Sequence, residues 1–325
     1  MNVTAGDVAR RARDAGDVIV ILNPTSGAGR GARIAAEIGT ELQRRGVPFQ
    51  LLRTEHAAHA RSLAYAAASE RVPVVVAAGG DGTIHDVANG ILSAGRDAAT
   101  ALGVIPIGRG NDFVKVVPGT TPRPRAYDTI AARAERRLDV GRAEWDGGSE
   151  YFLNAMGTGI DVEVVRQIAR LGNLPAGLVY IAGLVRALAR YDSIPLRVTV
   201  DGRRVERKVM LMAVANGCSV GGSFRLCPDA RPDDGVLDVC IVREVGLVRA
   251  AWLASRFVGG THGASPAVEI VTAREVEVEV MGDASLFLQL DGELREPPDA
   301  RVARVTVEPG ALRVLAQPPA YENRT

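Results

Sequence analysis

The segment Val72–Thr83 reads VPVVVAAGGDGT, an apolar run that ends in a glycine-rich turn. Residues 72–78 are apolar at every position, which predicts a strand that is buried on both faces. Ile84, Val87 and Ile91 follow with helical spacing. A doubly buried strand, a turn and an amphipathic helix in succession predict one unit of a parallel sheet that is covered by helices.

The same succession occurs on either side of this segment. Strands and helices alternate as a strand over Val18–Leu22, a helix over Ala32–Arg45, a strand over Phe49–Arg53, a helix over Ala57–Ser69 and a strand over Leu102–Ile107. In parallel sheets of this kind, ligands bind at the carboxyl ends of the strands, where the glycine-rich turns of this sequence fall. We therefore expect residues 1–125 to form an α/β domain with a parallel sheet.

The pattern changes near Leu138. Short runs, several with alternating apolar and polar residues, predict strands over Tyr151–Ala155, Leu196–Val200, Val209–Asn216, Leu237–Arg243, Val276–Met281, Leu286–Asp291 and Val302–Val307. Helical periodicity remains only over Val162–Leu188, with a break at Gly172–Pro175, and over Leu247–Phe257. Pro118–Arg125 has the composition of a linker. We expect residues 126–325 to form an antiparallel β-sandwich-like domain with appended helices.

The composition excludes several classes of protein. The 325 residues include 39 Lys+Arg and 38 Asp+Glu, so a nucleic-acid-binding protein with a broad basic surface is not expected. Cys218, Cys227 and Cys240 lack the spacing of a disulfide framework or a zinc site, and we expect buried free thiols. Because the sequence shows neither a signal peptide nor about 18 consecutive apolar residues, we expect a cytoplasmic protein that does not span a membrane.

The loop Asn23–Gly31 leads from the first strand into the first helix. Its glycines allow backbone N–H groups to converge, and the helix amino terminus adds partial positive charge, so the loop favours an anion. It lacks the Walker pattern G-x-x-x-x-G-K-[ST]. Taken alone, it also fits an ordinary strand-to-helix turn.

Two more loops follow predicted strands of the same sheet. Gly79–Thr83 allows a phosphate to approach the backbone closely, and Asp81 is placed to meet a hydroxyl or a metal, although an N-cap role would fit it equally well. Gly108–Phe113 forms the third loop. Because the three loops should converge at one edge of the sheet, they predict a nucleotide site.

Together the loops resemble the N-P-x-S-G, G-G-D-G-T and G-T-x-N-D-F motifs of the soluble diacylglycerol kinase-like lipid kinases. This family includes the bacterial diacylglycerol and phosphatidylglycerol kinases and the sphingosine kinases. The resemblance extends over Val18–Leu315, through further motifs at Leu138–Gly141, Phe152–Asn154, Gly157–Asp161, Gly221–Ala230, Asp233–Asp238 and Asp291–Glu293. The G-G-D-G-T motif alone would also fit an NAD kinase, but the ordered series favours the lipid kinase family.

The resemblance implies an NAD kinase- and diacylglycerol kinase-like α/β domain that binds ATP. It also implies a β-rich domain that binds the lipid, with the active site in the cleft between the two. Carried over position by position, the nucleotide-binding residues are Asn23, Pro24, Thr25, Ser26, Gly27, Thr54, Gly79, Gly80, Asp81, Gly82, Thr83, Arg109, Asn111 and Asp112.

The resemblance further implies roles for carboxylates. Glu293 would be the general base, since a carboxylate within hydrogen-bond reach of the acceptor hydroxyl can take its proton. Asp81 would act beside it and, with Asp139, would hold Mg²⁺ or its waters. A second, structural Mg²⁺ site would use Asp234 and the backbone carbonyls of Arg231 and Val236. An Asp-Gly turn between two strands is the alternative for this segment.

The sequence departs from the family pattern at two places. Arg109 stands where Thr is usual, and a guanidinium there could pair with phosphate. His85 and Asp86 replace the common Asn-Glu pair. Both departures bear on the choice of nucleotide and substrate. His56 and His59 fit a helix-surface pair better than metal ligands, because no third ligand is near in sequence.

The leading hypothesis is an ATP- and Mg²⁺-dependent kinase that phosphorylates diacylglycerol to phosphatidic acid. The alternatives are a kinase for a sphingoid base, phosphatidylglycerol or NAD, and a regulator that binds nucleotide or lipid without catalysis. A lipid substrate implies transient contact with the inner face of the membrane. The arginine-flanked apolar residues of Val162–Leu188 could form the lipid entrance, or pack in the core. A homodimer is left open.

Overall fold

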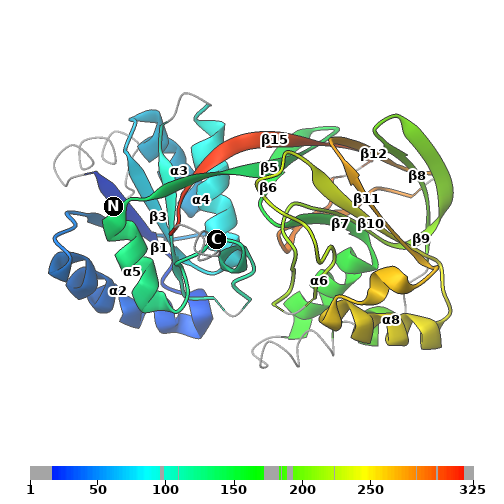
Figure 1. Cartoon of the computed structure of the whole chain (residues 1–325), viewed down its shortest axis with the longest axis horizontal. Helices are drawn as coiled ribbons and strands as arrows, with labels where there is room; N and C mark the ends of the chain where they lie inside the picture. Colours follow the sequence, from blue (N-terminus) through cyan, green and yellow to red (C-terminus); the bar gives the residue numbers. More distant parts are fainter. Residues whose placement is uncertain are drawn as a thin grey trace, which may run out of the picture. The chain divides into compact units, whose positions relative to one another are not determined.

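The computed structural model describes residues 17–95, 99–108, 110–171, 183, 185–188, 193–222, 224–282, 284–297 and 299–317. Two compact units share the chain: the first comprises Met1–Leu138 with Gly310–Thr325, and the second comprises Asp139–Pro309. Strand β5 (Glu135–Trp145) leads from the first unit into the second, and β15 (Val302–Leu315) leads back. Figure 1 shows both units coloured along the sequence.

The first unit is built on a parallel sheet in the order β4-β3-β1-β2. Its strands are β1 (Val18–Leu22), β2 (Gln50–Arg53), β3 (Val74–Gly79) and β4 (Ala101–Pro106). The end of β15 adds to β4 in parallel, with Val314 opposite Leu102. Every residue of β1, β3 and β4 is buried, which explains why their sequences are continuously apolar.

Helices cover both faces of this sheet. They are α2 (Ser26–Arg44), α3 (His59–Ser69), α4 (Asp81–Ser93) and α5 (Arg123–Ala132). Right-handed crossovers place α2 on one face, and the chain reverses direction after β2, so α3 and α4 fall on the other. The helices follow this rule in Figure 1, where α2 lies with α5. The point of reversal lies between β1 and β3, which is where such sheets bind ligands.

The second unit is antiparallel. Its central path runs β14-β13-β7-β9-β8-β12-β15, with β10 beside β9, β11 beside β10, and β6 beside β5. The strands not yet bounded are β6 (Gly148–Phe152), β7 (Ala155–Gly159), β8 (Ile194–Val200), β9 (Arg203–Ala215), β10 (Leu237–Arg243), β11 (Val268–Ala273), β12 (Glu275–Val280), β13 (Leu288–Leu290) and β14 (Glu293–Arg295).

Two apolar cores lie on opposite faces of β9 and β10. Met212 and Val239 point into a core between layers of strands, whereas Ala213 and Cys240 point into a core shared with helices α6 (Ile160–Leu171) and α8 (Leu247–Gly259). Successive side chains of a strand point to opposite faces, so this unit has strands in its centre and helices on one side. Short 3₁₀ turns occur at Phe113–Lys115 and His262–Ala264.

The structure confirms the α/β plus antiparallel β architecture and corrects three details. Helix α2 begins at Ser26 rather than Ala32. Pro118–Arg125 is not simply a linker, because α5 begins at Arg123 and packs Tyr127 and Ile130 into the first core. The boundary predicted at residue 125 accordingly falls at Leu138, and the chain rejoins the first unit from Gly310.

The cysteines are free thiols, with Cys227 and Cys240 buried and Cys218 partly exposed. In the described residues, no helix has the length and apolarity needed to cross a bilayer. Only residues 162–171, 183 and 185–188 of the predicted helical stretch Val162–Leu188 are described, and these are helical. The predicted break at Gly172–Pro175 lies outside the described residues.

Candidate functional site

Three glycine-rich loops of the first unit meet at the carboxyl ends of its strands, as predicted. A Cβ on Gly108 would lie 2.6 Å from the Cα of Gly80, and a Cβ on Gly27 would lie 2.4 Å from the carbonyl oxygen of Ile107. Because these neighbours are backbone atoms, no larger residue fits without moving a loop. The three loops therefore form one close-packed cradle of backbone at the carboxyl-terminal edge of the sheet, where sheets of this kind bind ligands.

Polar side chains fasten the first loop to the second. Asn23 donates from Nδ2 to Oγ1 of Thr83 at 3.2 Å. The Oδ1 atom of Asn23 accepts from the backbone N–H of Thr25 at 3.0 Å and from its hydroxyl at 2.8 Å. Asn23 thus makes an Asx-type turn at the end of β1, and α2 starts directly after it. This turn, rather than an extended loop, presents the amino terminus of α2.

Asp81 connects the second loop to the third. Gly80 is the N-cap of α4 and Asp81 its first residue, so the carboxylate is free to reach away from its own helix. Its Oδ1 atom accepts from the backbone N–H of Asp112 at 2.7 Å and of Phe113 at 3.4 Å. The N-cap alternative for Asp81 is therefore wrong, because this carboxylate organises the neighbouring loop instead.

The environment of Asp81 favours a cation. Burial, together with the nearby charge of Asp112, raises the pKa of Asp81 to about 6, although backbone N–H groups counteract this. Asp112 is itself buried, and Nζ of Lys115 donates to its carboxylate at 2.6 Å. A positive ion beside these two carboxylates would stabilise their charged forms. The donor set therefore fits a divalent cation.

One buried polar atom in this cradle has no partner among the described residues. Asn111, at a positive φ of 49°, donates from Nδ2 to the carbonyl of Gly108 at 3.2 Å, but its buried Oδ1 accepts from no described residue. Buried polar atoms are nearly always hydrogen-bonded, so an acceptor left over at a predicted ligand site is consistent with a donor supplied by the ligand.

The remaining predicted nucleotide residues fall around the same edge. Thr54 directly follows β2 and donates its N–H to the carbonyl of Leu22 at 2.9 Å. Pro24 precedes α2, and Ser26 and Gly82 lie in the first turns of α2 and α4. Arg109 lies outside the described residues. The departure at His85 is buried in α4 near Asn89, whereas Asp86 pairs with Arg61 at 3.4 Å. Both side chains thus engage the packing of α3 and α4.

His56 and His59 do not show the geometry of a metal pair. Their rings stack with centroids 4.7 Å apart, and Nδ1 of His59 accepts from the N–H of Glu55 at 3.1 Å. His59 is buried, so the prediction of a surface pair is right for His56 alone.

In the second unit, Asp139 braces the turn that carries the predicted second metal site. Its buried carboxylate accepts from the N–H of Gly235 at 2.7 Å, and its own N–H donates to the carbonyl of Pro232 at 2.7 Å. Asp234 Oδ1 accepts from the N–H of Val236 at 3.2 Å, which makes the Asp-Gly turn that the sequence left as an alternative. Asp139 therefore has a structural role, because it fixes the turn between Pro232 and Gly235.

The predicted cation at this turn stays a prediction. Arg231 and Asp234 are exposed, and the described residues hold no group of three His, Cys, Asp or Glu side chains placed to bind a metal. Carboxylates do gather nearby, since burial and the charges of Asp234 and Asp229 raise the pKa of Asp238 to about 6. Backbone carbonyls would have to supply the other ligands.

The predicted base lies next to a tight hairpin turn. Leu290 pairs with Glu293, and the two residues between them, Asp291 and Gly292, have φ values of 51° and 88°. Positive φ at both positions is the geometry that an Asp-Gly hairpin favours. Asp291 accepts from the N–H groups of Leu153, Asn154 and Ala155 at 2.8–3.1 Å. The turn is thus fixed to the start of β7, and Glu293 is exposed.

Strand β14 is also held from its other end. The guanidinium of Arg295 makes two hydrogen bonds to the carboxylate of Glu150, one of them at 2.8 Å, and Glu150 is buried. Glu293 and Arg295 are two residues apart, so their side chains leave the strand on the same face. The bidentate pair therefore restricts the strand from which Glu293 projects.

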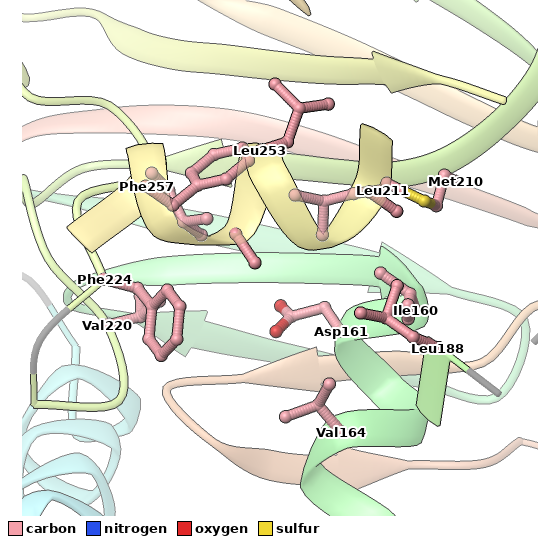
Figure 2. Close-up of a pocket in the computed structure, with 13 residues that line it drawn as sticks. Ile160, Asp161, Val164, Leu188, Met210, Leu211, Val220, Phe224, Leu253 and Phe257 are labelled. Carbon is pink, nitrogen blue, oxygen red and sulfur yellow. The ribbon is translucent and has the colours of Figure 1, made fainter. Parts of the chain in front are cut away.

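Sequence reasoning missed an apolar pocket of the second unit (Figure 2). It encloses about 640 Å³, including space open to solvent. It is lined by α6, the helical residues 185–188, β9, α8 and the segment before β10, through Ile160, Asp161, Val164, Leu188, Met210, Leu211, Val220, Phe224, Leu226, Ala250, Leu253, Ala254 and Phe257. Asp161 is the single ionisable side chain among them.

A hydrogen-bonded chain connects this pocket to the hairpin. Gln289 donates from Nε2 to Oδ2 of Asp161 at 2.6 Å, and its Oε1 accepts from the N–H of Gly292 at 2.7 Å. Burial raises the pKa of Asp161 to about 6, and the bond from Gln289 partly opposes this. The single carboxylate of the pocket is thus connected through one side chain to the residue that precedes Glu293.

Comparisons with known proteins find domain-level matches along both parts of the chain. Residues 17–143 match the model of the diacylglycerol kinase catalytic domain, and residues 154–316 match that of the YegS C-terminal NAD kinase beta sandwich-like domain. A Xanthomonas oryzae pv. oryzae protein named "Probable lipid kinase YegS-like" is 33% identical over 286 residues, which are 87% of this chain and 91% of that protein.

Two further comparisons concern diacylglycerol kinases. The diacylglycerol kinase of Bacillus subtilis is 30% identical over 278 residues, covering 84% of this chain and 88% of that protein. The fold is similar to the crystal structure of a diacylglycerol kinase from Bacillus anthracis, with a TM-score of 0.71, 21% identity and coverage of 93% and 97% of the two chains. This chain therefore belongs to the diacylglycerol kinase-like family of lipid kinases.

Proposed function

We propose that the protein transfers the γ-phosphoryl group of ATP, with Mg²⁺, to the hydroxyl of diacylglycerol and so forms phosphatidic acid. The observation that carries this choice is the pocket, whose described lining has a single carboxylate among apolar side chains and is connected by Gln289 to the turn beside Glu293. Apolar walls suit acyl chains, whereas a water-soluble acceptor would require more polar groups.

The nucleotide site is proposed at the cradle of the first unit. Its backbone N–H groups and the amino termini of α2 and α4 favour the phosphates of ATP. Asn23 and Thr83 hold the first two loops together, and Asp81 holds the third. Mg²⁺ would neutralise charge on the β- and γ-phosphates, and Asp81 would be its first-unit ligand. Asp139 would be the ligand from the second unit.

Glu293 is proposed to remove the proton of the acceptor hydroxyl. Phosphoryl transfer needs positioning and charge neutralisation more than covalent help, so a single well-placed carboxylate is sufficient. The hairpin turn and the Arg295–Glu150 pair restrict the strand that carries Glu293. Asp161 would hydrogen-bond the glycerol part of the lipid while the apolar walls hold its acyl chains.

The test is transfer of label from γ-labelled ATP to a lipid. Purified protein with Mg²⁺ is given diacylglycerol, a mixed lipid extract or NAD, and the label is partitioned between organic and aqueous phases. We expect organic label that migrates with phosphatidic acid. We also expect Glu293→Gln to reduce transfer by at least about 100-fold, the order that a general base contributes, without loss of ATP binding.

The other outcomes identify the alternatives. Organic label that appears only with the lipid extract would replace diacylglycerol by another lipid alcohol, such as phosphatidylglycerol or a sphingoid base. Aqueous label that depends on NAD would contradict a lipid acceptor. ATP binding with no transfer to any acceptor would favour a regulator over a kinase, and Glu293→Gln with wild-type transfer would contradict the assignment of the base.

A further inference from the structure

Exposed apolar side chains gather on helix α8. Seven large apolar side chains are exposed in the described part of the chain, and four of them lie on this one helix. Their exposed fractions are 60% for Leu247, 87% for Val248, 45% for Trp252 and 51% for Val258. A single exposed apolar residue needs no explanation, but a cluster on one element indicates a surface that binds something.

Helix α8 is apolar on two opposite faces. Ala250, Leu253 and Phe257 form the inner face, where they are buried and line the pocket. Val248 and Trp252 are one turn apart on the opposite face. A helix that packs against a core on one side alone has polar residues on its outer side. The outer face of α8 therefore departs from the pattern of a helix that faces water.

The charges of this helix have one sign. Its thirteen residues include Arg249 and Arg256 and no acidic residue, and the nearest acid in the sequence is Glu244, before the helix begins. The guanidinium carbon of Arg256 lies 4.6 Å from the centre of the Trp252 ring. Tryptophan and arginine side chains suit the boundary between lipid headgroups and acyl chains, because each has an apolar part and a polar end.

We propose that the outer face of α8 docks on the surface of an anionic bilayer. This face comprises Leu247, Val248, Trp252 and Val258, with Arg249 and Arg256 beside them. An interfacial helix of this composition inserts its apolar side chains among the headgroups and attracts anionic lipid through its arginines. Because the inner face of the same helix lines the pocket, docking would place the pocket beside the bilayer. This inference rests on the proposed function, because that function assigns a lipid as the ligand of the pocket.

A second copy of the chain fits this face less well. Thirteen residues of helix extend for about 20 Å, and a strip about 10 Å wide along it offers about 200 Å². A stable protein–protein interface buries about 800 Å² on each partner. The outer face alone is therefore too small for a dimer, whereas insertion into a bilayer has no such minimum.

Tryptophan fluorescence can report docking directly. The chain has two tryptophans, Trp145 and Trp252, so Trp145→Phe leaves Trp252 as the single probe. With vesicles of phosphatidylcholine and phosphatidylglycerol and no ATP, we expect a blue shift of its emission and quenching by brominated lipid. We expect binding at least about tenfold weaker to phosphatidylcholine vesicles, since each arginine near an anionic surface adds attraction.

Paired variants separate the apolar from the electrostatic contribution by vesicle sedimentation. Val248→Ser with Trp252→Ser should weaken binding to both kinds of vesicle by at least about tenfold. Arg249→Gln with Arg256→Gln should weaken binding to anionic vesicles alone. Tyr65→Ser is the matched control, because Tyr65 is 50% exposed but lies on α3 of the first unit; it should bind like the wild type. All variants should keep the wild-type melting temperature.

The outcomes distinguish this inference from the proposed function. Phosphorylation of a short-chain diacylglycerol below its aggregation concentration should be the same in the wild type and in the α8 variants. If anionic vesicles cause no shift and no quenching of Trp252 emission while the kinase is active, docking by α8 is wrong and the proposed function stands. If vesicles bind through α8 and no lipid is phosphorylated, the function fails instead. A dimer in light scattering that Val248→Ser with Trp252→Ser dissociates, without vesicle binding, would replace the bilayer by a second copy.

Discussion

The amide nitrogen of Gln289 lies 2.6 Å from a carboxylate oxygen of Asp161, so the floor of the pocket and the hairpin beside Glu293 share one buried side chain. The amide oxygen of the same residue accepts from the N–H of Gly292 at 2.7 Å. There is little room for rearrangement, because a Cβ on Gly157 would lie 2.0 Å from the carboxylate oxygen and 2.8 Å from the amide nitrogen. The two elements are therefore positioned together.

Breaking this connection should impair catalysis more than it impairs folding. Gln289→Leu removes both hydrogen bonds at similar volume, so the hairpin loses one anchor and Asp161 loses its donor. We expect kcat to fall about tenfold or more while the KM for ATP is unchanged, because the first unit is untouched. Gln289→Glu is the informative comparison: it keeps the acceptor for Gly292 but faces Asp161 with a second carboxylate. Equal kcat in all three proteins would remove Gln289 from the catalytic arrangement.

The free energy of unfolding should depend on pH through the ionisation of Asp161. The pKa of Asp161 is raised to about 6 by burial, above its value in an unfolded chain of about 3.9. Between these pKa values the folded state binds the proton more strongly, so this contribution is present at acid pH and is lost as pH rises through about 6. Above that pH, the buried carboxylate opposes folding.

Asp161→Asn should remove this dependence. We expect its free energy of unfolding relative to the wild type to rise by about 2 kcal/mol between pH 4 and pH 7.5, measured by urea denaturation. Asp146→Asn is the control, since Asp146 is exposed in the turn between β5 and β6. A constant difference between Asp161→Asn and the wild type across this range would contradict a raised pKa at Asp161.

The close approach of Gly80 and Gly108 should make the nucleotide site sensitive to one methyl group. Gly108→Ala places a Cβ 2.6 Å from backbone, which forces the second and third loops apart. We expect a loss of about 1–3 kcal/mol in stability and at least tenfold in ATP affinity, measured by ATP-dependent thermal shift. Gly39→Ala has no atom within 4 Å of the new Cβ and lies within α2. It should stabilise by up to about 1 kcal/mol and leave ATP affinity unchanged.

The parts of the fold predicted from sequence are those where local pattern and burial agree. Strand β10 was predicted as Leu237–Arg243 and has these bounds, because one face packs between strands and the other against helices. Helix α5 was missed because Pro122 and Pro124 suggested a linker. Proline fits the first turn of a helix, where no backbone donor is needed. The first residues of α2 were missed for a related reason, since three glycines disfavour a helix that tertiary contacts then impose.

The candidate site divides in the same way. The three loops were found because each is contiguous in sequence and has required backbone conformations. The Asp291–Glu293 turn was found through the family resemblance alone. The pocket was not found, because five separate segments build it and none has a distinctive pattern alone. Gln289 gave no signal either, since it is an isolated polar residue in a short apolar strand. Asp161 was noticed only within a family motif.

Asp81 should contribute to stability through its oxygen and to catalysis through its charge. Asp81→Asn retains an oxygen that can accept from Asp112 and Phe113, so we expect a melting temperature close to the wild type. Phosphoryl transfer should nevertheless fall by at least about 100-fold, because the negative charge that favours a cation is gone. Asp81→Ala should lower both the melting temperature and transfer. Wild-type transfer by Asp81→Asn would mean that this carboxylate serves the loops alone.

Variants of Arg295 and Glu150 should separate two effects of this pair: the positioning of strand β14 and the burial of the Glu150 charge. Arg295→Met leaves buried Glu150 without its guanidinium partner, which should destabilise the protein by about 3–5 kcal/mol in urea denaturation. Adding Glu150→Gln removes the buried charge and should restore most of this loss. Transfer should recover less completely than stability, because β14 no longer has its bidentate anchor and Glu293 projects from that strand. If kcat recovers fully in the double variant, the hairpin turn alone positions Glu293. Glu150→Gln with Arg295 intact then provides the matched single variant, and its kcat shows whether the charge or the hydrogen bonds of Glu150 matter.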